Sequence, residues 1–119
     1  MKNLIKFVFV MMVGILAVAG TGYAVDMGSI TILSPKDGSI VPAGSVTKLM
    51  YNVKLSPEGN HLHVYVDDQK PIVDRDVSAC PCSINLPMLN AGKHMVVIKE
   101  ARADHSLTGV MATTAVTAK

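Results

Sequence analysis

Short runs of alternating apolar and polar residues, separated by prolines and glycines, make up most of this sequence. About six or seven such runs follow one another between Ser29 and Ala118, at a spacing of roughly 8 to 12 residues. Because side chains alternate across a strand, each run can bury one face and leave the other in solvent. No long helical period is present beyond the N-terminal segment. The pattern predicts an all-β sandwich of about seven strands.

The expected strands differ in length and in their place in the sheets. Pro42 keeps the segment at 40–44 at a sheet edge, and the polar stretch at 69–76 has room for only a short strand. The longer predicted strands cover residues 29–33, 46–55, 60–68, 82–89, 93–101 and 107–118. In the second of these, the buried face is expected to carry Thr47, Leu49, Tyr51, Val53 and Leu55.

The strand predicted at 60–68 is expected to lie at the centre of a sheet. One of its faces is apolar, and the other carries both histidines of a His-x-His motif. The apolar face consists of Leu62, Val64 and Val66, and the opposite face of His61, His63, Tyr65 and Asp67. One face is therefore assigned to the core, and the other to solvent or to chemistry.

The N-terminal segment has the features of a secretory signal peptide. Lys2 and Lys6 precede an uncharged run at 7–25, and the apolar part at 7–19 has the length of a hydrophobic signal region. An uncleaved membrane anchor is the alternative, because the whole run approaches the length that spans a bilayer. Small residues at the end of the run favour cleavage.

The cleavage site is expected directly after Ala24. Gly22 and Ala24 provide the small side chains that the −3 and −1 positions require, and residues 17–19 offer a second candidate cut. We therefore expect a signal-peptide helix at 1–24 and one domain at 25–119, exported to the periplasm or secreted. Ninety-five residues suffice for one small domain and not for two.

The excess of positive charge belongs to that N-terminal segment. Lys2 and Lys6 are two of the eleven basic residues, so nine basic and nine acidic residues remain in the expected mature domain. A near-neutral domain offers no basic surface for nucleic acid or for an anionic membrane. We therefore expect no nucleic-acid partner, and no membrane association after cleavage. Tyr51 and Tyr65 are its only aromatic residues, so aliphatic side chains and methionine must build the core.

Several short motifs resemble one family of exported proteins. The segments at 32–38 and 86–94 look like the first strand and the E–F corner of bacterial immunoglobulin-like domains. A narrower resemblance is to small periplasmic immunoglobulin-like proteins of uncharacterised function, through His61-x-His63, Gly92-Lys93-His94 and Ala103-Asp104-His105. The resemblance implies an immunoglobulin-like β-sandwich and no particular activity. The chain lacks the core tryptophan and the inter-sheet cysteine pair of antibody domains.

The resemblance also implies where the four histidines lie. Strands C, F and G of one sheet correspond to the predicted strands at 60–68, 93–101 and 107–118. Since strands C and F run antiparallel, His61 and His63 are expected at the same end of the sandwich as His105. His94 begins strand F at the opposite end, where a tyrosine corner would stand, and its ring is expected to hydrogen-bond the corner backbone. One site made by all four histidines is therefore not expected.

His61 and His63 are the strongest candidates for a metal site. Residues two apart share one face of a strand, and neutral imidazole is a ligand of both zinc and copper. With His105 as the third ligand, they are predicted to hold one transition-metal ion, either copper or zinc. The alternative is a pair of exposed imidazoles on a polar sheet face.

Cys80 and Cys82 form a second candidate site, with one proline between them. Three outcomes are open: a local labile disulfide, thiolates that bind a soft ion such as Cu(I), or bonds to other molecules. A disulfide here closes a very short ring, so it restrains little of the chain. Two cysteines are too few for a disulfide framework, and no basic residue adjoins them to activate a thiol.

Methionines and aspartates admit less specific interpretations. The methionines can serve as copper thioethers, but in a domain poor in aromatics we expect most of them to fill the core. The aspartates lack the spacing of an EF-hand loop and suit solvated strand ends. No nucleophile elbow, phosphate-binding loop or Cys/His/Asn signature is present in the sequence, so we expect a non-enzyme.

Two functions remain in competition. The first is binding of copper or zinc by the three histidines. The second is a metal-free interaction or structural module, which would pair the outer face of the C–F–G sheet with another exported protein or a second copy of the chain. On that face Tyr65, Met95 and Val97 are expected to form a partly apolar surface.

Overall fold

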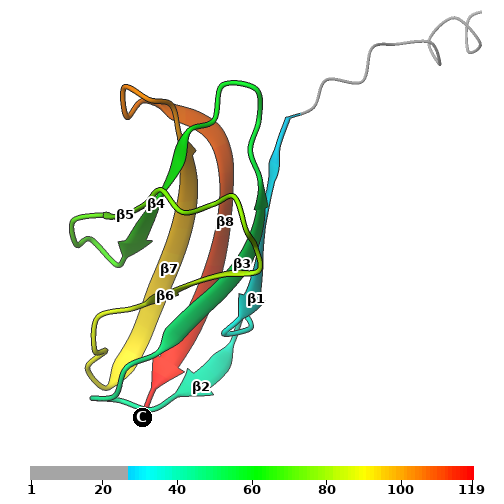
Figure 1. The fold of residues 1–119 in the computed structure, drawn as a ribbon. Helices are drawn as coiled ribbons and strands as arrows, with labels where there is room; N and C mark the ends of the chain where they lie inside the picture. The colour runs from blue at the N-terminus through cyan, green and yellow to red at the C-terminus, as the bar shows by residue number, and fades with distance from the viewer. Residues whose placement is uncertain (1–26) are drawn as a thin grey trace, which may run out of the picture.

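The structure is a computed structural model that describes residues 27–119. The expected signal peptide at 1–24 and its cleavage site lie outside these residues. Within 27–119, no helix is long and apolar enough to cross a membrane. The described chain is all-β, as the alternating pattern predicts, and its strands form two facing sheets (Figure 1).

Eight strands occupy the described part of the chain. Six of them match the longer runs predicted from the sequence, and the other two are three-residue strands at the edges of the larger sheet. Their bounds are β1 Ser29–Ser34, β2 Ser39–Val41, β3 Lys48–Lys54, β4 His61–Val66, β5 Ile72–Asp74, β6 Cys82–Asn85, β7 Gly92–Ala101 and β8 Leu107–Ala118. The strand predicted at 82–89 ends early, because Pro87 follows soon after and provides no backbone donor.

The strand order confirms the predicted neighbours of the His-x-His strand. The smaller sheet has the order β1-β3-β6, and the larger has the order β2-β8-β7-β4-β5. β4 and β7 are antiparallel, with His61 opposite Ala101 and Tyr65 opposite Val97. β7 and β8 form a long antiparallel hairpin that dominates the larger sheet (Figure 1). The start of β4 therefore lies beside the turn of that hairpin, as the antiparallel arrangement predicts.

Inward-facing aliphatic side chains from both sheets form the core. The predicted inner faces of β3 and β4 are confirmed, because Leu49, Tyr51, Leu62 and Val64 are fully buried. Alternation along β7 adds further buried aliphatic side chains opposite those of β4. The remaining core residues are Val41, Val66, Cys82, Leu86, Leu89, Val96, Ile98, Val116 and Ala118.

The prediction that methionine fills the core is wrong. All five methionines of residues 27–119 are exposed: Met27, Met50, Met88, Met95 and Met111. Three of them, Met50, Met95 and Met111, lie on strands with their side chains on the outer face. The residues next to them in the sequence point inward, so the branched aliphatic residues take the core positions. The stiffer side chains of valine and isoleucine suit a pleated, close-packed surface, which explains how this core forms without methionine.

A buried carboxylate fixes the turn that leads into β4. Glu100 is fully buried on the inner face of β7. It accepts hydrogen bonds from the backbone N–H and hydroxyl of Ser56 and from the hydroxyl of Thr108. A Cβ on Gly59 would lie 2.5 Å from this carboxylate, so a larger residue there would push Glu100 away from its hydrogen-bond partners. These contacts hold the segment before His61 against β7 and β8.

Candidate metal centre

His61 and His63 project from the outer face of β4, where β4 lies between β5 and β7. The register places His61 opposite Ala101, and His63 between Val73 of β5 and Lys99 of β7. Both rings are buried, His61 completely and His63 with 7% exposure. The alternative of two exposed imidazoles on a polar sheet face is therefore wrong.

His105 reaches the same end of the sheet from the turn between β7 and β8. The turn is closed by backbone hydrogen bonds, from the N–H of Arg102 to Ser106 and from the N–H of His105 to Arg102. The Asp104 carboxylate accepts two further bonds from Ser106. His105 itself has a φ of 71°, a left-handed conformation that histidine adopts at a low frequency. Its ring remains exposed, so the cluster meets solvent on this side.

Three ring nitrogens converge on one point. Nε2 of His61 lies 3.0 Å from Nε2 of His63 and 3.2 Å from Nδ1 of His105. The third side of the triangle, from Nε2 of His63 to Nδ1 of His105, is 3.1 Å. The geometry brings together the three residues that the sequence predicts as metal ligands, as a nearly equilateral set.

Asn60 fixes the orientation of the first ring. The Nδ1–H of His61 donates to Oδ1 of Asn60 over 2.9 Å. The same oxygen faces Nη1 of Arg75 at 3.4 Å, and because a guanidinium can only donate, this contact identifies the atom as oxygen. With the proton of His61 held on Nδ1, its Nε2 points to the centre as a lone pair.

The second ring is held more loosely. Nδ1 of His63 lies 3.4 Å from the hydroxyl of Tyr65, and the two rings meet edge to face. The Nζ of Lys99 in turn lies 5.2 Å from the centre of the Tyr65 ring. Tyr65 therefore links the histidine cluster to the exposed face of the sheet, in addition to its predicted place on that face.

Burial and nearby positive charge favour the neutral form of both strand histidines. Burial is the main cause that lowers the pKa of His61 below 6.5, and the charges of Arg75, His105 and His63 lower it further. Burial also lowers the pKa of His63 below 6.5, with contributions from His105 and Arg75. Neutral imidazole is the form that binds a metal ion, so the surroundings prepare these two rings for that role.

The triangle has nearly the size of one face of a tetrahedral metal site. Zinc binds histidine nitrogens at about 2.0 to 2.1 Å, which separates tetrahedral ligands by about 3.3 to 3.4 Å. The nitrogens of His61, His63 and His105 need to move apart by only a few tenths of an ångström to match that spacing. Three protein ligands leave a fourth position for water or another donor.

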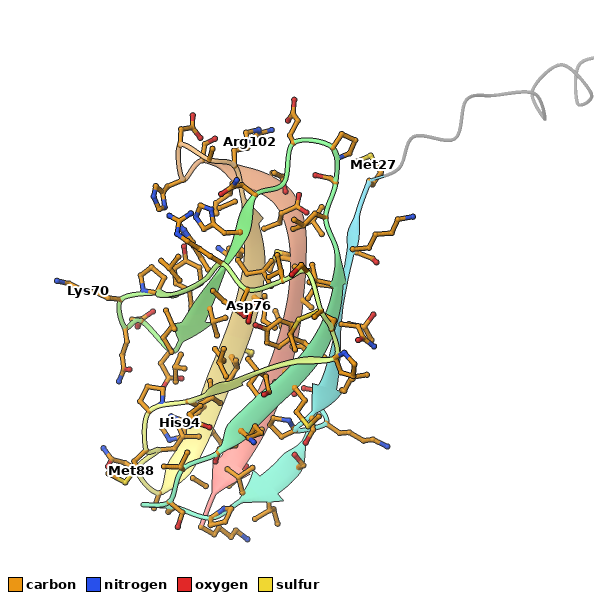
Figure 2. The ribbon with its side chains drawn as sticks, in the orientation of Figure 1. Met27, Lys70, Asp76, Met88, His94 and Arg102 are labelled. Atoms are coloured by element: carbon orange, nitrogen blue, oxygen red, sulfur yellow. A yellow bond between two sulfur atoms is a disulfide. The ribbon has the colours of Figure 1, made fainter. Side chains whose placement is uncertain are left out.

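His94 lies apart from this cluster, as the topology predicts. Figure 2 shows it towards the lower end of the sandwich, whereas Arg102 of the β7–β8 turn lies at the upper end. Its Nε2–H donates to the carbonyl oxygen of Asn90 over 2.6 Å, the predicted bond to the corner backbone. Its Nδ1–H donates to the Asp67 carboxylate over 2.7 Å.

Cys80 and Cys82 form a disulfide with each other. Neither sulfur is a free thiolate, and residues 27–119 contain no free cysteine. Of the three outcomes that the sequence leaves open, the structure has the local disulfide. Cys82 is the first residue of β6 and is buried, whereas Cys80 lies in the irregular segment before it and is partly exposed.

The predicted interaction face is present on the outside of the larger sheet. Tyr65 and Val97 lie opposite each other on β4 and β7, and Met95 on the same face of β7 is 47% exposed. Tyr65, Val97 and Lys99 also line a shallow cavity with Asp67, Asp68 and Gln69. The face is therefore partly apolar and also carries the charged side chain of Lys99.

Two residues of the cluster were not found from the sequence. Asn60 precedes the His-x-His motif directly, so its adjacency was the signal that a polar residue could orient His61. Arg75 lies beyond β5 and has no such signal. Only the pairing of β5 with β4 brings its side chain near Asn60.

Comparisons with known proteins identify the fold. No protein-family model matches the sequence, and no curated protein matches it. Among solved structures, the chain is similar to the fibronectin(III)-like modules of CbhA from Clostridium thermocellum. The TM-score is 0.59, with 20% sequence identity over 76% of this chain and 94% of that chain. The fold class is therefore an immunoglobulin-like β-sandwich, similar in fold to a fibronectin(III)-like module.

Proposed function

We propose that this protein is an exported metal-binding module that holds one copper or zinc ion through His61, His63 and His105. The observation that carries the proposal is the convergence of three ring nitrogens within 3.2 Å of one another. Such a set matches the nitrogen ligands of both metals.

The protonation pattern supports a cation at the centre of the triangle. Each neutral imidazole carries one N–H and one lone pair, and Asn60 takes the N–H of His61. If one of the other two rings directs its N–H into the triangle, that hydrogen bond joins at most two of the three nitrogens with good geometry. A metal ion accepts all three lone pairs at once, so it relieves the repulsion among them. The lowered pKa values of His61 and His63 act in the same direction.

Export to an oxidising compartment is part of the same proposal. The lysines, apolar run and small residues of the N-terminal segment support secretion, to the periplasm or beyond the cell. The disulfide between Cys80 and Cys82 agrees with that compartment, since disulfides persist where thiols are not kept reduced. We infer binding rather than catalysis, because the likeness to a fibronectin(III)-like module favours a binding or structural role.

Metal titration of the mature chain tests the proposal. Isothermal calorimetry at neutral pH should show one ion of Zn(II), Cu(II) or Cu(I) bound per chain. At a free metal concentration about 100 times Kd, the folded state should gain about 2.7 kcal/mol, with a matching rise in Tm. His105→Gln should weaken binding while the fold stays intact, because that ring is exposed. His94→Gln is the matched control and should retain full affinity. Absence of tight binding to all three ions would overturn the proposal.

A second candidate function follows from the partly apolar outer face. Met95, Tyr65 and Val97 offer a surface that can pair with another exported protein or with a second copy of the chain. Met95→Lys should then weaken that association without changing metal affinity. Analytical ultracentrifugation of the mature chain measures self-association, and a monomer at all concentrations would leave only a different protein as the partner.

A further inference from the structure

We propose that the Cys80–Cys82 disulfide is a thiol-exchange site that accepts two electrons from a dithiol in an extended peptide segment. This activity is independent of the histidine cluster. The proposal rests on the spacing of the two cysteines, on their unequal exposure and on the position of Cys82 at the start of an edge strand.

The spacing makes this bond a weak structural support. Only Pro81 separates the two cysteines, so the disulfide closes the smallest of loops and restrains very little of the unfolded chain. Cys82 is already held by β6, which pairs with β3 through Met50, Tyr51 and two further residues. Strand pairing places Cys82 without help from the bond, so the bond adds little to the position of β6 and is free to take part in exchange.

The unequal burial of the two cysteines assigns the position of attack. Cys82 is 6% exposed and belongs to the core, whereas Cys80 packs against the core from an irregular segment and is only partly buried. The Cys80 sulfur has one polar neighbour, the carbonyl oxygen of Val77 at 4.0 Å. Cys80 is the less buried of the two residues, so its sulfur is the proposed target of an incoming thiolate, which must approach along the S–S axis.

The edge of the smaller sheet provides a place for the substrate backbone. β6 is the last strand of the order β1-β3-β6, and no strand among residues 27–119 pairs with its other side. An extended peptide can add to such an edge through main-chain hydrogen bonds. This addition would bring a cysteine of the peptide next to the disulfide, because Cys82 is the first residue of β6.

The exchange balances in two steps. A substrate thiolate bonds to the Cys80 sulfur, the bond between Cys80 and Cys82 breaks, and the electron pair leaves on the Cys82 sulfur. The second substrate thiolate then attacks the substrate sulfur of this mixed disulfide and releases the Cys80 thiolate. The substrate is oxidised to a disulfide by two electrons. Cys80 and Cys82 are reduced to thiols and take up the two protons that the substrate thiols lose.

Equilibration with glutathione tests the reactivity of the native protein. The mature chain is held in buffers of graded glutathione ratio, quenched with acid and alkylated, and mass spectrometry counts the reduced cysteines. We expect half-reduction within the range of ratios that glutathione buffers cover, whereas structural disulfides of exported proteins resist that pool. A bond that stays oxidised at equilibrium with a large excess of reduced glutathione would overturn the proposal.

Single variants test the assigned position of attack. With glutathione disulfide, the thiol left in Cys82→Ser should form a mixed disulfide at least about tenfold faster than the thiol left in Cys80→Ser, because Cys80 is the less buried residue. Equal rates would contradict attack at Cys80. Circular dichroism checks the fold of both variants, and if either fails to fold, the glutathione equilibrium of the native chain alone decides.

A pair of peptides tests the class of substrate. An unstructured peptide with two cysteines should reduce the disulfide faster than the same peptide with prolines beside its cysteines, since proline removes the N–H groups that pair with a strand edge. Equal rates for the two peptides would exclude recognition through β6. Reduction of the native disulfide by neither peptide would overturn the proposed activity.

Discussion

The side-chain oxygen of Asn60 lies 2.9 Å from Nδ1 of His61 and thereby decides which nitrogen of that ring faces the other two histidines. Such partners of metal ligands fix both the tautomer and the orientation of the ring. Asn60→Ala should therefore lower metal affinity by about 10- to 100-fold. Asn60→Asp keeps an acceptor at the same position and should bind metal at least as well as the native chain. Equal affinity of all three proteins in calorimetric titration would contradict this role for Asn60.

His105 and His63 should respond differently to the same substitution. His105 is exposed on a turn, so His105→Gln should lower metal affinity and leave the stability of the metal-free protein within about 0.5 kcal/mol of the native value. His63 is buried between two strands, so His63→Gln should lower both affinity and stability. Urea unfolding with and without metal separates the two effects. An unchanged affinity of His105→Gln would remove it from the proposed site.

The alternation of apolar residues was sufficient to predict the sheets and the inner faces of β3 and β4. Side-chain direction along a strand follows from its period of two, so Leu49 and Tyr51, or Leu62 and Val64, had to point the same way. The antiparallel pairing of β4 with β7 then placed the His-x-His strand beside the turn that carries His105. Local pattern and topology together thus predicted which histidines meet.

The sequence pattern did not predict that the histidine cluster is buried. His61 and His63 face outward, yet both are buried, because the side chains of Asn60, Tyr65 and His105 lie against their rings. The contact of Arg75 with Asn60 depends on the pairing of β5 with β4. The prediction that methionines fill the core failed for a related reason, since hydrophobicity alone does not decide which face of β8 carries Met111, which is exposed. Strand register decides it.

Glu100 provides a test of the turn that leads into the metal site. Its carboxylate is fully buried and accepts hydrogen bonds from Ser56 and Thr108. Burial acts to raise its pKa, but these hydrogen bonds outweigh that effect and hold the pKa below 4.5. Glu100→Gln places an amide N–H₂ among donors and should cost about 1 to 3 kcal/mol of stability. Gly59→Ala crowds the same carboxylate and should also destabilise the fold in urea unfolding. Unchanged stability of both variants would contradict the role of this contact.

The disulfide should contribute little to stability. Because Cys80 and Cys82 are only two positions apart, the chain-entropy model gives less than about 2 kcal/mol for the bond. The double variant Cys80→Ser with Cys82→Ser should accordingly remain folded, with a modest decrease in the urea midpoint. A loss of several kcal/mol would show that the bond is a structural support.

The pair of His94 and Asp67 should make stability depend on pH at the end of the sandwich opposite the proposed metal site. Both ring nitrogens of His94 face acceptors, which is the pattern of a protonated ring. The hydrogen bond to Asp67 is the main cause that raises the pKa of His94 above 6.5, and the bond to Asn90 raises it further. Burial acts to raise the pKa of Asp67, but hydrogen bonds from His94 and the N–H of Met95 lower it below 3.8.

These two shifts define the window in which the pair stabilises the fold. A raised histidine pKa stabilises the folded state fully below pH 6.5, and the contribution fades as pH rises through the raised value. A lowered aspartate pKa stabilises the folded state above pH 3.8, and the contribution is lost as pH falls through the lowered value. The contribution of the pair is therefore greatest between pH 3.8 and 6.5.

The variant His94→Gln should show directly the pH range in which the pair of His94 and Asp67 stabilises the fold. Because Asp67 is partly exposed and solvent weakens the pair, the variant should cost about 1 kcal/mol near pH 5 and less near pH 9. Asp67→Asn should show the same trend, while metal affinity stays at the native level in both variants. Urea unfolding at a series of pH values gives the difference from the native protein at each pH. A difference that is independent of pH would show that His94 is neutral in the folded state and that the ion pair does not form.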